Sequence, residues 1–174
     1  MEILTPRLRL QPLCDKDIEE LASLDADSEV MRGSSGFAIP RNRVGTVEWL
    51  QQTLSVSTTD AWLTFRVDDR LSGAFLGRCG LRPEEGSGET ELAYAFAQPA
   101  WGRGIATESA SVVVKRGFES GLTRIVGSAL AANLASLRVL EKIGMRRTRE
   151  DLTSVGIVIR HELDRPGRPT AVPR

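Results

Sequence analysis

Two glycines flank an arginine in a short turn, Trp101-Gly102-Arg103-Gly104, which follows a strand-like run and precedes a run with helical spacing. The first N–H groups of a helix have no partner inside the helix, and the helix dipole adds partial positive charge there. Glycine lets an anion approach the backbone closely and permits positive φ. The pattern therefore predicts a cradle for phosphate or diphosphate. The residues expected to form it are Trp101, Gly102, Arg103, Gly104, Ile105, Ala106 and Thr107.

The same turn has a plainer interpretation, a tight turn that only starts a helix. Two familiar phosphate-binding loops are excluded, because the chain has no Gly-x-x-x-x-Gly-Lys-Ser/Thr motif and no third glycine at dinucleotide-fold spacing. The segments downstream of the turn must therefore decide between the two interpretations.

Length and composition predict one globular domain. The chain has 174 residues, of which 41% are hydrophobic and 26% are charged. The 23 basic residues balance the 23 acidic ones, so we expect no nucleic-acid partner bound through bulk charge.

Cys14 and Cys79 are far apart and in no metal-binding spacing, so no metal site is expected. No apolar run approaches the roughly 20 residues of a membrane span, and the first residues resemble a strand rather than a signal peptide. The sequence thus predicts a cytoplasmic protein with no membrane partner.

Periodicity predicts the elements that position the turn. Strands are expected over residues 5–11, 61–68, 73–81, 89–97, 123–130, 145–150 and 155–163. Helices are expected over residues 18–25, 40–54, 104–121 and 133–143. A loop is expected over 28–40. Because a helix separates strands 89–97 and 123–130, we expect these two strands to be parallel.

Two segments give the chain a family resemblance. Residues 101–108 (WGRGIATE) and 133–145 (NLASLRVLEKIGM), about 30 residues apart, resemble the GNAT superfamily of acetyl-CoA-dependent N-acetyltransferases. The opening residues 5–10 (TPRLRL) and the W-G-x-G-x-A-T form of the turn resemble its RimJ/RimL branch, which includes enzymes that acetylate ribosomal-protein N-termini. The resemblance covers residues 4–163.

The resemblance implies an α/β fold of the α+β type. It predicts one domain over residues 1–164, with a mixed, mostly antiparallel twisted sheet of about seven strands and about four helices on both faces. The parallel pair is expected to splay apart. Residues 165–174 are expected to form a disordered tail.

Acetyl-CoA is the co-substrate that the resemblance implies. Its diphosphate is expected on the N–H groups of residues 101–107, and its pantetheine arm between the splayed strands, beside backbone groups near Phe96 and Ala97. Pro99 stands where the superfamily commonly has glutamine or arginine. The backbone can still bind the diphosphate there.

Direct attack of an amine on the thioester needs a base, an oxyanion donor and an acid for the departing thiolate. The family usually uses a strand N–H as the oxyanion donor, here that of Phe96 or Ala97. Glu91 is the candidate base, directly or through water. A solvated or ion-paired carboxylate is the alternative interpretation of Glu91.

The acid is expected to be Ser136, because Leu140 stands where many members carry a tyrosine. Ser136 could instead make only a local backbone bond. Asn133 is expected to cap the last helix and to bind the pantetheine. Core packing is the favoured interpretation of Tyr94, and His161 could either be buried or touch the substrate.

The acceptor is expected to be a primary amine, with a protein N-terminal α-amine as the first candidate. The alternatives are a small amine, such as a polyamine, amino acid or antibiotic, and a non-catalytic CoA-binding module. A homodimer is a further expectation that the sequence does not test.

Overall fold

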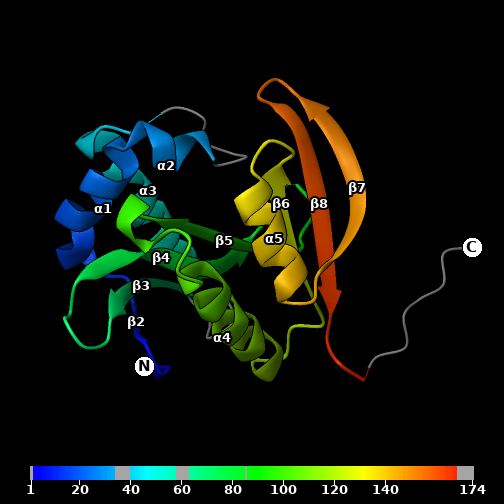
Figure 1. The fold of residues 1–174 in the computed structure, drawn as a ribbon, viewed down its shortest axis with the longest axis horizontal. Helices are drawn as coiled ribbons and strands as arrows, with labels where there is room; N and C mark the ends of the chain where they lie inside the picture. The colour runs from blue at the N-terminus through cyan, green and yellow to red at the C-terminus, as the bar shows by residue number, and fades with distance from the viewer. Residues whose placement is uncertain (1, 34–39, 58–62, 85, 168–174) are drawn as a thin grey trace, which may run out of the picture.

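The structure is a computed structural model that describes residues 2–33, 40–57, 63–84 and 86–167. One sheet runs through the molecule with eight strands in the order β1-β2-β3-β4-β5-β6-β8-β7 (Figure 1). The strands are β1 (Ile3–Leu4), β2 (Leu8–Pro12), β3 (Thr64–Asp69), β4 (Phe75–Pro83), β5 (Thr90–Phe96), β6 (Arg124–Leu130), β7 (Arg146–Thr153) and β8 (Gly156–Asp164). Every neighbouring pair is antiparallel except β5 and β6, the predicted parallel pair.

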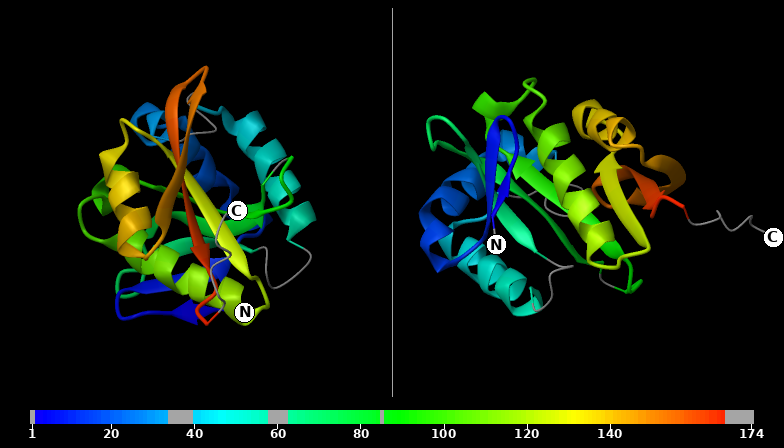
Figure 2. Two further views of the ribbon diagram at one scale, coloured as in Figure 1. Left: turned by 90° about the vertical axis from the view of Figure 1, so that its right-hand side faces the viewer. Right: turned by 90° about the horizontal axis from the view of Figure 1, so that it is seen from below.

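Helices cover both faces of this sheet (Figure 2). On one side lie α1 (Ile18–Ala26), α2 (Ser28–Arg32) and α3 (Arg43–Val56). On the other side lie α4 (Ile105–Glu119) and α5 (Leu134–Lys142). Two short 3₁₀ turns, Asp15–Asp17 and Gln98–Ala100, precede α1 and the glycine turn.

The predicted fold class is confirmed, and two expectations about its elements are corrected. The helix α2 begins inside the stretch 28–40 that was expected to be a loop, so there are five α-helices rather than four among the described residues. The short strand β1 raises the sheet to eight strands. Residues 34–39 of the expected loop, 61–62 of an expected strand and 168–174 of the expected tail lie outside the described residues.

The α4 face contains the main core. The helical stripe predicted from the sequence is buried, including Ala110, Val113 and Phe118. Gly117 completes the stripe, because a Cβ there would lie 2.4 Å from Leu81 Cδ1. The missing side chain lets α4 lie close against β4, so the start of this helix has a fixed place above the sheet.

The opposite face holds a buried ionic cluster. Asp25 is fully buried and accepts hydrogen bonds from Arg78 Nη1 at 2.5 Å and Arg41 Nη1 at 3.2 Å. Both guanidinium groups also lie over the Trp49 ring, 4.2 and 5.5 Å from its centroid. A buried carboxylate needs such partners. Here the partners connect α1 with β4 and with the segment that precedes α3.

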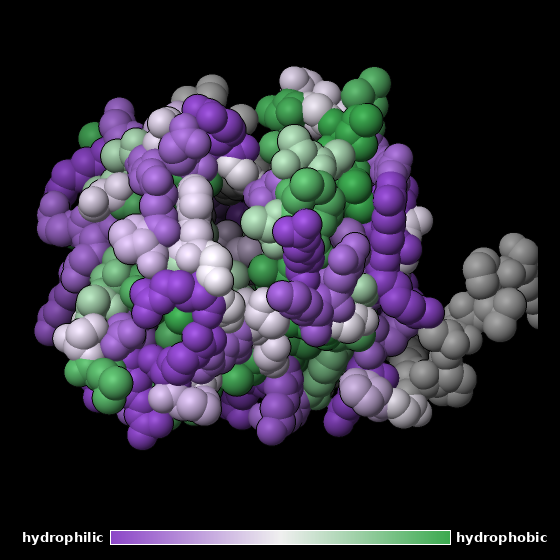
Figure 3. Space-filling view, in the orientation of Figure 1, coloured by the Kyte–Doolittle hydropathy of each residue, from purple (hydrophilic) through white to green (hydrophobic). Residues whose placement is uncertain are grey.

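On the face shown in Figure 3, apolar side chains gather over α5 and the tip of the β7–β8 hairpin. Leu134, Leu152, Val155 and Ile157 are exposed there. Among the described residues, no helix combines the length and hydropathy that crossing a membrane requires.

The burial of His161 leads us to predict how the free energy of unfolding depends on pH. It is 1% exposed on β8, facing Gly127 of β6 and Arg147 of β7, and burial lowers its pKa below the ordinary 6.5 despite the opposing charge of Glu141. The unfolded chain therefore binds more protons than the folded one as pH falls below about 6.5. The free energy of unfolding should therefore decrease as the pH is lowered below about 6.5.

Urea unfolding at several pH values tests this, with His161→Gln as the comparison. The glutamine variant should lose the decrease between about pH 6.5 and 5. Carboxylates such as Glu84 and Glu108, whose pKa values lie below 4.5, take up protons and so affect the free energy of unfolding only at lower pH. Equal slopes in both proteins within this window would contradict the assignment.

Candidate functional site

The parallel strands β5 and β6 are paired at one register position only, Glu91 opposite Val126. On its other side β5 is bonded to β4 from Thr90 to Phe96, and β6 is bonded along its length to β8. Beyond Glu91 the two strands therefore diverge, and within the part of the chain that the structure describes, the backbone of β5 that faces β6 has no strand partner. An unpaired strand edge of this kind can accept an extended ligand.

The backbone direction at the end of β5 separates the two predicted oxyanion donors. The N–H of Ala97 donates to Leu76 O at 2.9 Å, so it points toward β4. Because successive N–H groups of a strand point in opposite directions, the N–H of Phe96 points into the gap. The Trp101 indole donates to the Phe96 carbonyl at 2.7 Å and so fixes the turn to this edge.

The glycine turn leaves the start of α4 without a side-chain cap. Gly102 and Gly104 have φ values of 70° and 76°, and Gly104 is the N-cap of the 15-residue helix. By contrast, Asp27, Asn42 and Asn133 cap α2, α3 and α5 with their side chains. The first N–H groups of α4 are therefore available to an anion, as the cradle requires.

Arg7 holds this turn from the N-terminal side, a contact the sequence analysis missed. Its Nη1 donates to Arg103 O at 2.7 Å, and its Nε donates to Glu108 Oε2 at 2.7 Å. Thr5 Oγ1 also donates to Glu108 at 2.5 Å. Burial would raise the Glu108 pKa, but these hydrogen bonds outweigh it and hold the pKa below its usual value. The carboxylate nearest the cradle is thus neutralised by a guanidinium.

The start of α5 lies across the gap from β5. The Asn133 side chain accepts from Ser136 N at 3.0 Å, as expected of a cap, and also donates to Gly33 O at 2.8 Å. Ser136 Oγ lies 2.8 Å from the Tyr94 hydroxyl. Leu140, one turn later, is 1% exposed and belongs to the core. Tyr94 packs against the core as favoured, but its hydroxyl also reaches α5, which the sequence analysis missed.

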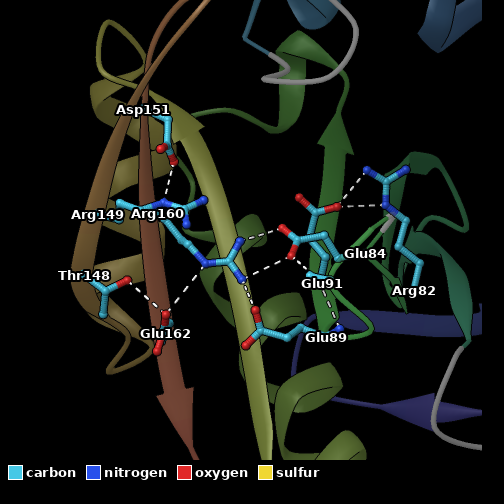
Figure 4. A network of polar contacts seen from close by, with 10 residues as sticks. Arg82, Glu84, Glu89, Glu91, Thr148, Arg149, Asp151, Arg160 and Glu162 are labelled. Carbon is cyan, nitrogen blue, oxygen red and sulfur yellow. Dashed lines mark hydrogen bonds and ion pairs between the residues drawn. The ribbon is translucent and has the colours of Figure 1, made fainter. Parts of the chain in front are cut away.

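Glu91 lies at the closed end of the gap, where Arg82 donates to its Oε2 from Nε at 3.0 Å and from Nη2 at 2.8 Å (Figure 4). Side chains at odd separations in a strand point to opposite faces, so Glu91 and Tyr94 lie on opposite sides of the sheet. The two are about 10 Å apart along β5. The Glu91 side chain therefore lies on the other face of the sheet from Tyr94, the residue that Ser136 contacts.

Beside Glu91 an ionic network joins the two sides of the closed end. Arg160 on β8 donates to Glu84 at 2.6 and 3.1 Å and to Glu89 at 2.5 Å (Figure 4). These hydrogen bonds, first of all those to Glu84, raise the Arg160 pKa. A cavity of about 380 Å³ opens beside them, lined also by Glu162 and Arg149. The sheet register places Arg160 and Glu162 on the same face as Glu91.

Comparison with known proteins identifies the family. The model of the acetyltransferase (GNAT) domain matches residues 7–146. The chain belongs to the GNAT acetyltransferase family. It is 34% identical over 148 residues to the uncharacterized protein YkkB of Bacillus subtilis, covering 83% of this chain and 84% of YkkB.

A second relative by sequence has a described activity. The FsC-acetyl coenzyme A-N(2)-transacetylase of Aspergillus fumigatus is 29% identical over 154 aligned residues, and the match covers 81% of this chain and 63% of that protein.

Solved GNAT structures share the fold at low identity. The ribosomal L7/L12 alpha-N-protein acetyltransferase RimL, solved with coenzyme A, has a TM-score of 0.81 at 12% identity, covering 94% of this chain and 98% of that chain. Spermidine N-acetyltransferase from Vibrio cholerae, solved with CoA and spermine, has a TM-score of 0.77 at 17% identity, covering 92% of this chain and 96% of that chain. At such identities the likeness extends to the fold alone.

Within this GNAT fold the predicted residues fall into two groups. The cradle residues 101–107 and Phe96 lie at the end of β5 and the start of α4, while Asn133 and Ser136 lie at the start of α5, where Ser136 contacts Tyr94 of β5. Glu91 lies apart at the closed end of the gap. The groups predicted to hold the cofactor thus border the open part of the gap.

A matched pair of glycine substitutions tests the cradle. Gly102 and Gly121 both have positive φ and open space where a Cβ would lie, but Gly121 is at the far end of α4. Valine is strained at either position, so both variants should melt at lower temperature. Only Gly102→Val should weaken CoA binding, by about tenfold or more, because hydrogen bonds to a charged group are lost.

Titration calorimetry with CoA, alongside thermal melting, measures both effects. Undiminished CoA affinity in a folded Gly102→Val protein would refute the cradle. Equal losses of affinity in both variants would refute it as well, since the strain alone would then explain the result.

Proposed function

We propose that this GNAT protein transfers the acetyl group of acetyl-CoA to a primary amine by direct attack within a ternary complex. The observation that carries the proposal is the unpaired edge of β5 leading into the uncapped start of α4. A strand edge suits the two amides of a pantetheine arm, and the helix start suits a diphosphate. One cofactor with both parts fits this arrangement.

In this proposal the N–H groups of residues 102–107 hold the diphosphate, because the N–H of Trp101, also predicted to do so, already donates to Gln98 O at 3.0 Å. The Phe96 N–H stabilises the oxyanion that forms when the amine attacks the thioester carbonyl. Ala97, the other predicted donor, already donates to Leu76 and serves the strand pairing. Asn133 and Ser136 border the pantetheine from α5, and Ser136 donates to the departing sulfur.

Glu91 remains the proposed base, acting through water. Arg82 Nε and Nη2 both donate to Glu91 Oε2, and the Glu91 side chain is 14% exposed. The carboxylate is about 17 Å along β5 from Phe96, too far for direct contact with an amine at the oxyanion site. A water chain along the gap is therefore part of the proposal.

The first acceptor we propose is a peptide N-terminal α-amine, in keeping with the RimJ/RimL-like form of the sequence. An α-amine has a pKa near 8, against about 10.4 for lysine, so it needs less help from a distant base. RimL, one of the fold neighbours, acts on a protein α-amine.

A small-molecule amine is the second candidate, and the Aspergillus relative favours it, because that protein is described as an N(2)-transacetylase. Vibrio cholerae spermidine N-acetyltransferase shows that the fold also serves polyamines.

Two further expectations stay proposals. A cytoplasmic location follows from the composition alone. A homodimer would give the exposed apolar side chains at the β7–β8 tip a partner.

Thiol release from acetyl-CoA separates an enzyme from a non-catalytic CoA-binding module. A panel of N-terminal peptides, polyamines and aminoglycosides should produce free CoA with at least one acceptor class, and mass spectrometry should find the product heavier by one acetyl group. CoA binding without release for every acceptor would favour the binding module instead.

Glu91→Gln tests the proposed base, with the exposed Glu119→Gln at the end of α4 as the control. At pH 7 the Glu91 variant should lose about a hundredfold in kcat, while Glu119→Gln should not change. With a peptide acceptor the loss should shrink toward pH 9, because the α-amine is then already deprotonated. Full turnover at pH 7 would remove Glu91 from the mechanism.

A further inference from the structure

Tyr94 makes a side-chain contact across the gap. Its hydroxyl lies 2.8 Å from Ser136 Oγ and 3.3 Å from Ser136 O. Its ring packs 6.3 Å from the Phe96 ring, tilted by 35°, on the α4 face of β5. The hydroxyl is thus held in place from β5 while it reaches the first turn of α5.

We infer that Tyr94 is a positioning residue for acetyl transfer: its hydroxyl donates to Ser136 Oγ, which leaves the one Ser136 hydroxyl proton free to point at the CoA sulfur. This inference rests on the proposed function. It adds a residue to that function rather than replacing one.

The donor assignment follows from the groups around the tyrosine. The only acceptors within 3.5 Å of its hydroxyl among the described residues are the two oxygens of Ser136. A phenol is a stronger acid than an aliphatic alcohol, so it is the better donor of the pair. Burial also raises the Tyr94 pKa, so the phenol keeps its proton at neutral pH. Of the two oxygens, Oγ is the nearer to the phenol, at 2.8 Å against 3.3 Å for the carbonyl, so we assign the Tyr94 proton to Ser136 Oγ.

Ser136 is itself fixed by the helix start. Its N–H donates to the Asn133 side chain at 3.0 Å, and Asn133 is tied in turn to Gly33. With its N–H bound to Asn133 and its Oγ accepting from Tyr94, the hydroxyl has one free choice, the direction of its own proton. Leu140, where the family often has a hydroxyl, cannot supply one.

The step balances without a further reactant. The amine nitrogen forms a bond to the carbonyl carbon, and the C–S bond then breaks with its electron pair going to sulfur. The Ser136 O–H hydrogen bond stabilises that charge until sulfur takes up a proton, which matches the proton lost by the amine. Tyr94 keeps its own proton throughout.

A double-mutant cycle of Tyr94→Phe, Ser136→Ala and the double variant tests the inference. Phenylalanine keeps the ring and its packing but removes the donor. Ser120→Ala is the control, because the hydrogen bonds of its hydroxyl, to Arg116 O and Gly117 O, are local ones at the end of α4. Each protein is assayed for kcat, for KM with acetyl-CoA, for CoA affinity by calorimetry and for thermal stability.

We expect Ser136→Ala to lower kcat about a hundredfold. Tyr94→Phe should lower kcat about tenfold and leave CoA affinity and KM unchanged. In the Ser136→Ala background, Tyr94→Phe should have no further effect, because the tyrosine acts through the serine. Ser120→Ala should match the parent protein.

Three outcomes would overturn the inference: an unchanged or raised kcat in Tyr94→Phe, independent multiplying losses in the double variant, or a loss that appears only in KM or stability. A raised kcat would mean that Ser136 donates to Tyr94 and is freed by its removal. Failure of the proposed function looks different, since the parent protein would then release no thiol with any amine.

Discussion

The single pairing of Glu91 with Val126 is the constraint on which the site depends. Neither strand can close the gap beyond it, because β5 is held to β4 and β6 is held to β8 along their lengths. The Arg160 network reinforces the closed end, where it links β8 to the segment between β4 and β5. Divergence is therefore built into the pairing of the sheet.

The open end of the gap is ordered by contacts between distant segments. The Trp101 indole donates a hydrogen bond to the Phe96 carbonyl, and the Tyr94 hydroxyl is hydrogen-bonded to Ser136. The Asn133 side chain donates to Gly33 O and so connects the end of α2 with the start of α5. These bonds join groups of the chain itself, and together they fix the groups around the gap relative to one another. A preorganised site loses less conformational entropy on binding.

The sequence predicted the features that local chemistry determines. Glycine at positive φ, the Asn133 cap and the buried stripe of α4 follow from residue type and period. Contacts between segments 42 to 103 residues apart, such as Tyr94 with Ser136 and Thr5 with Glu108, were not predictable. Periodicity assigned Tyr94 to its face correctly but could not show what its hydroxyl meets there. The five-residue α2 is too short for a period to be recognised.

Glu108 poses an electrostatic problem that the fold solves with one residue. A carboxylate in the first turn of α4 interacts well with the helix dipole but would repel a diphosphate at the same end. Arg7 neutralises it and, with the same guanidinium, holds the Arg103 carbonyl of the turn. The N-terminal segment therefore does more than extend the sheet. It turns an unfavourable charge into an anchor for the loop, which explains why the cradle can combine a helix start with an acidic residue beside it.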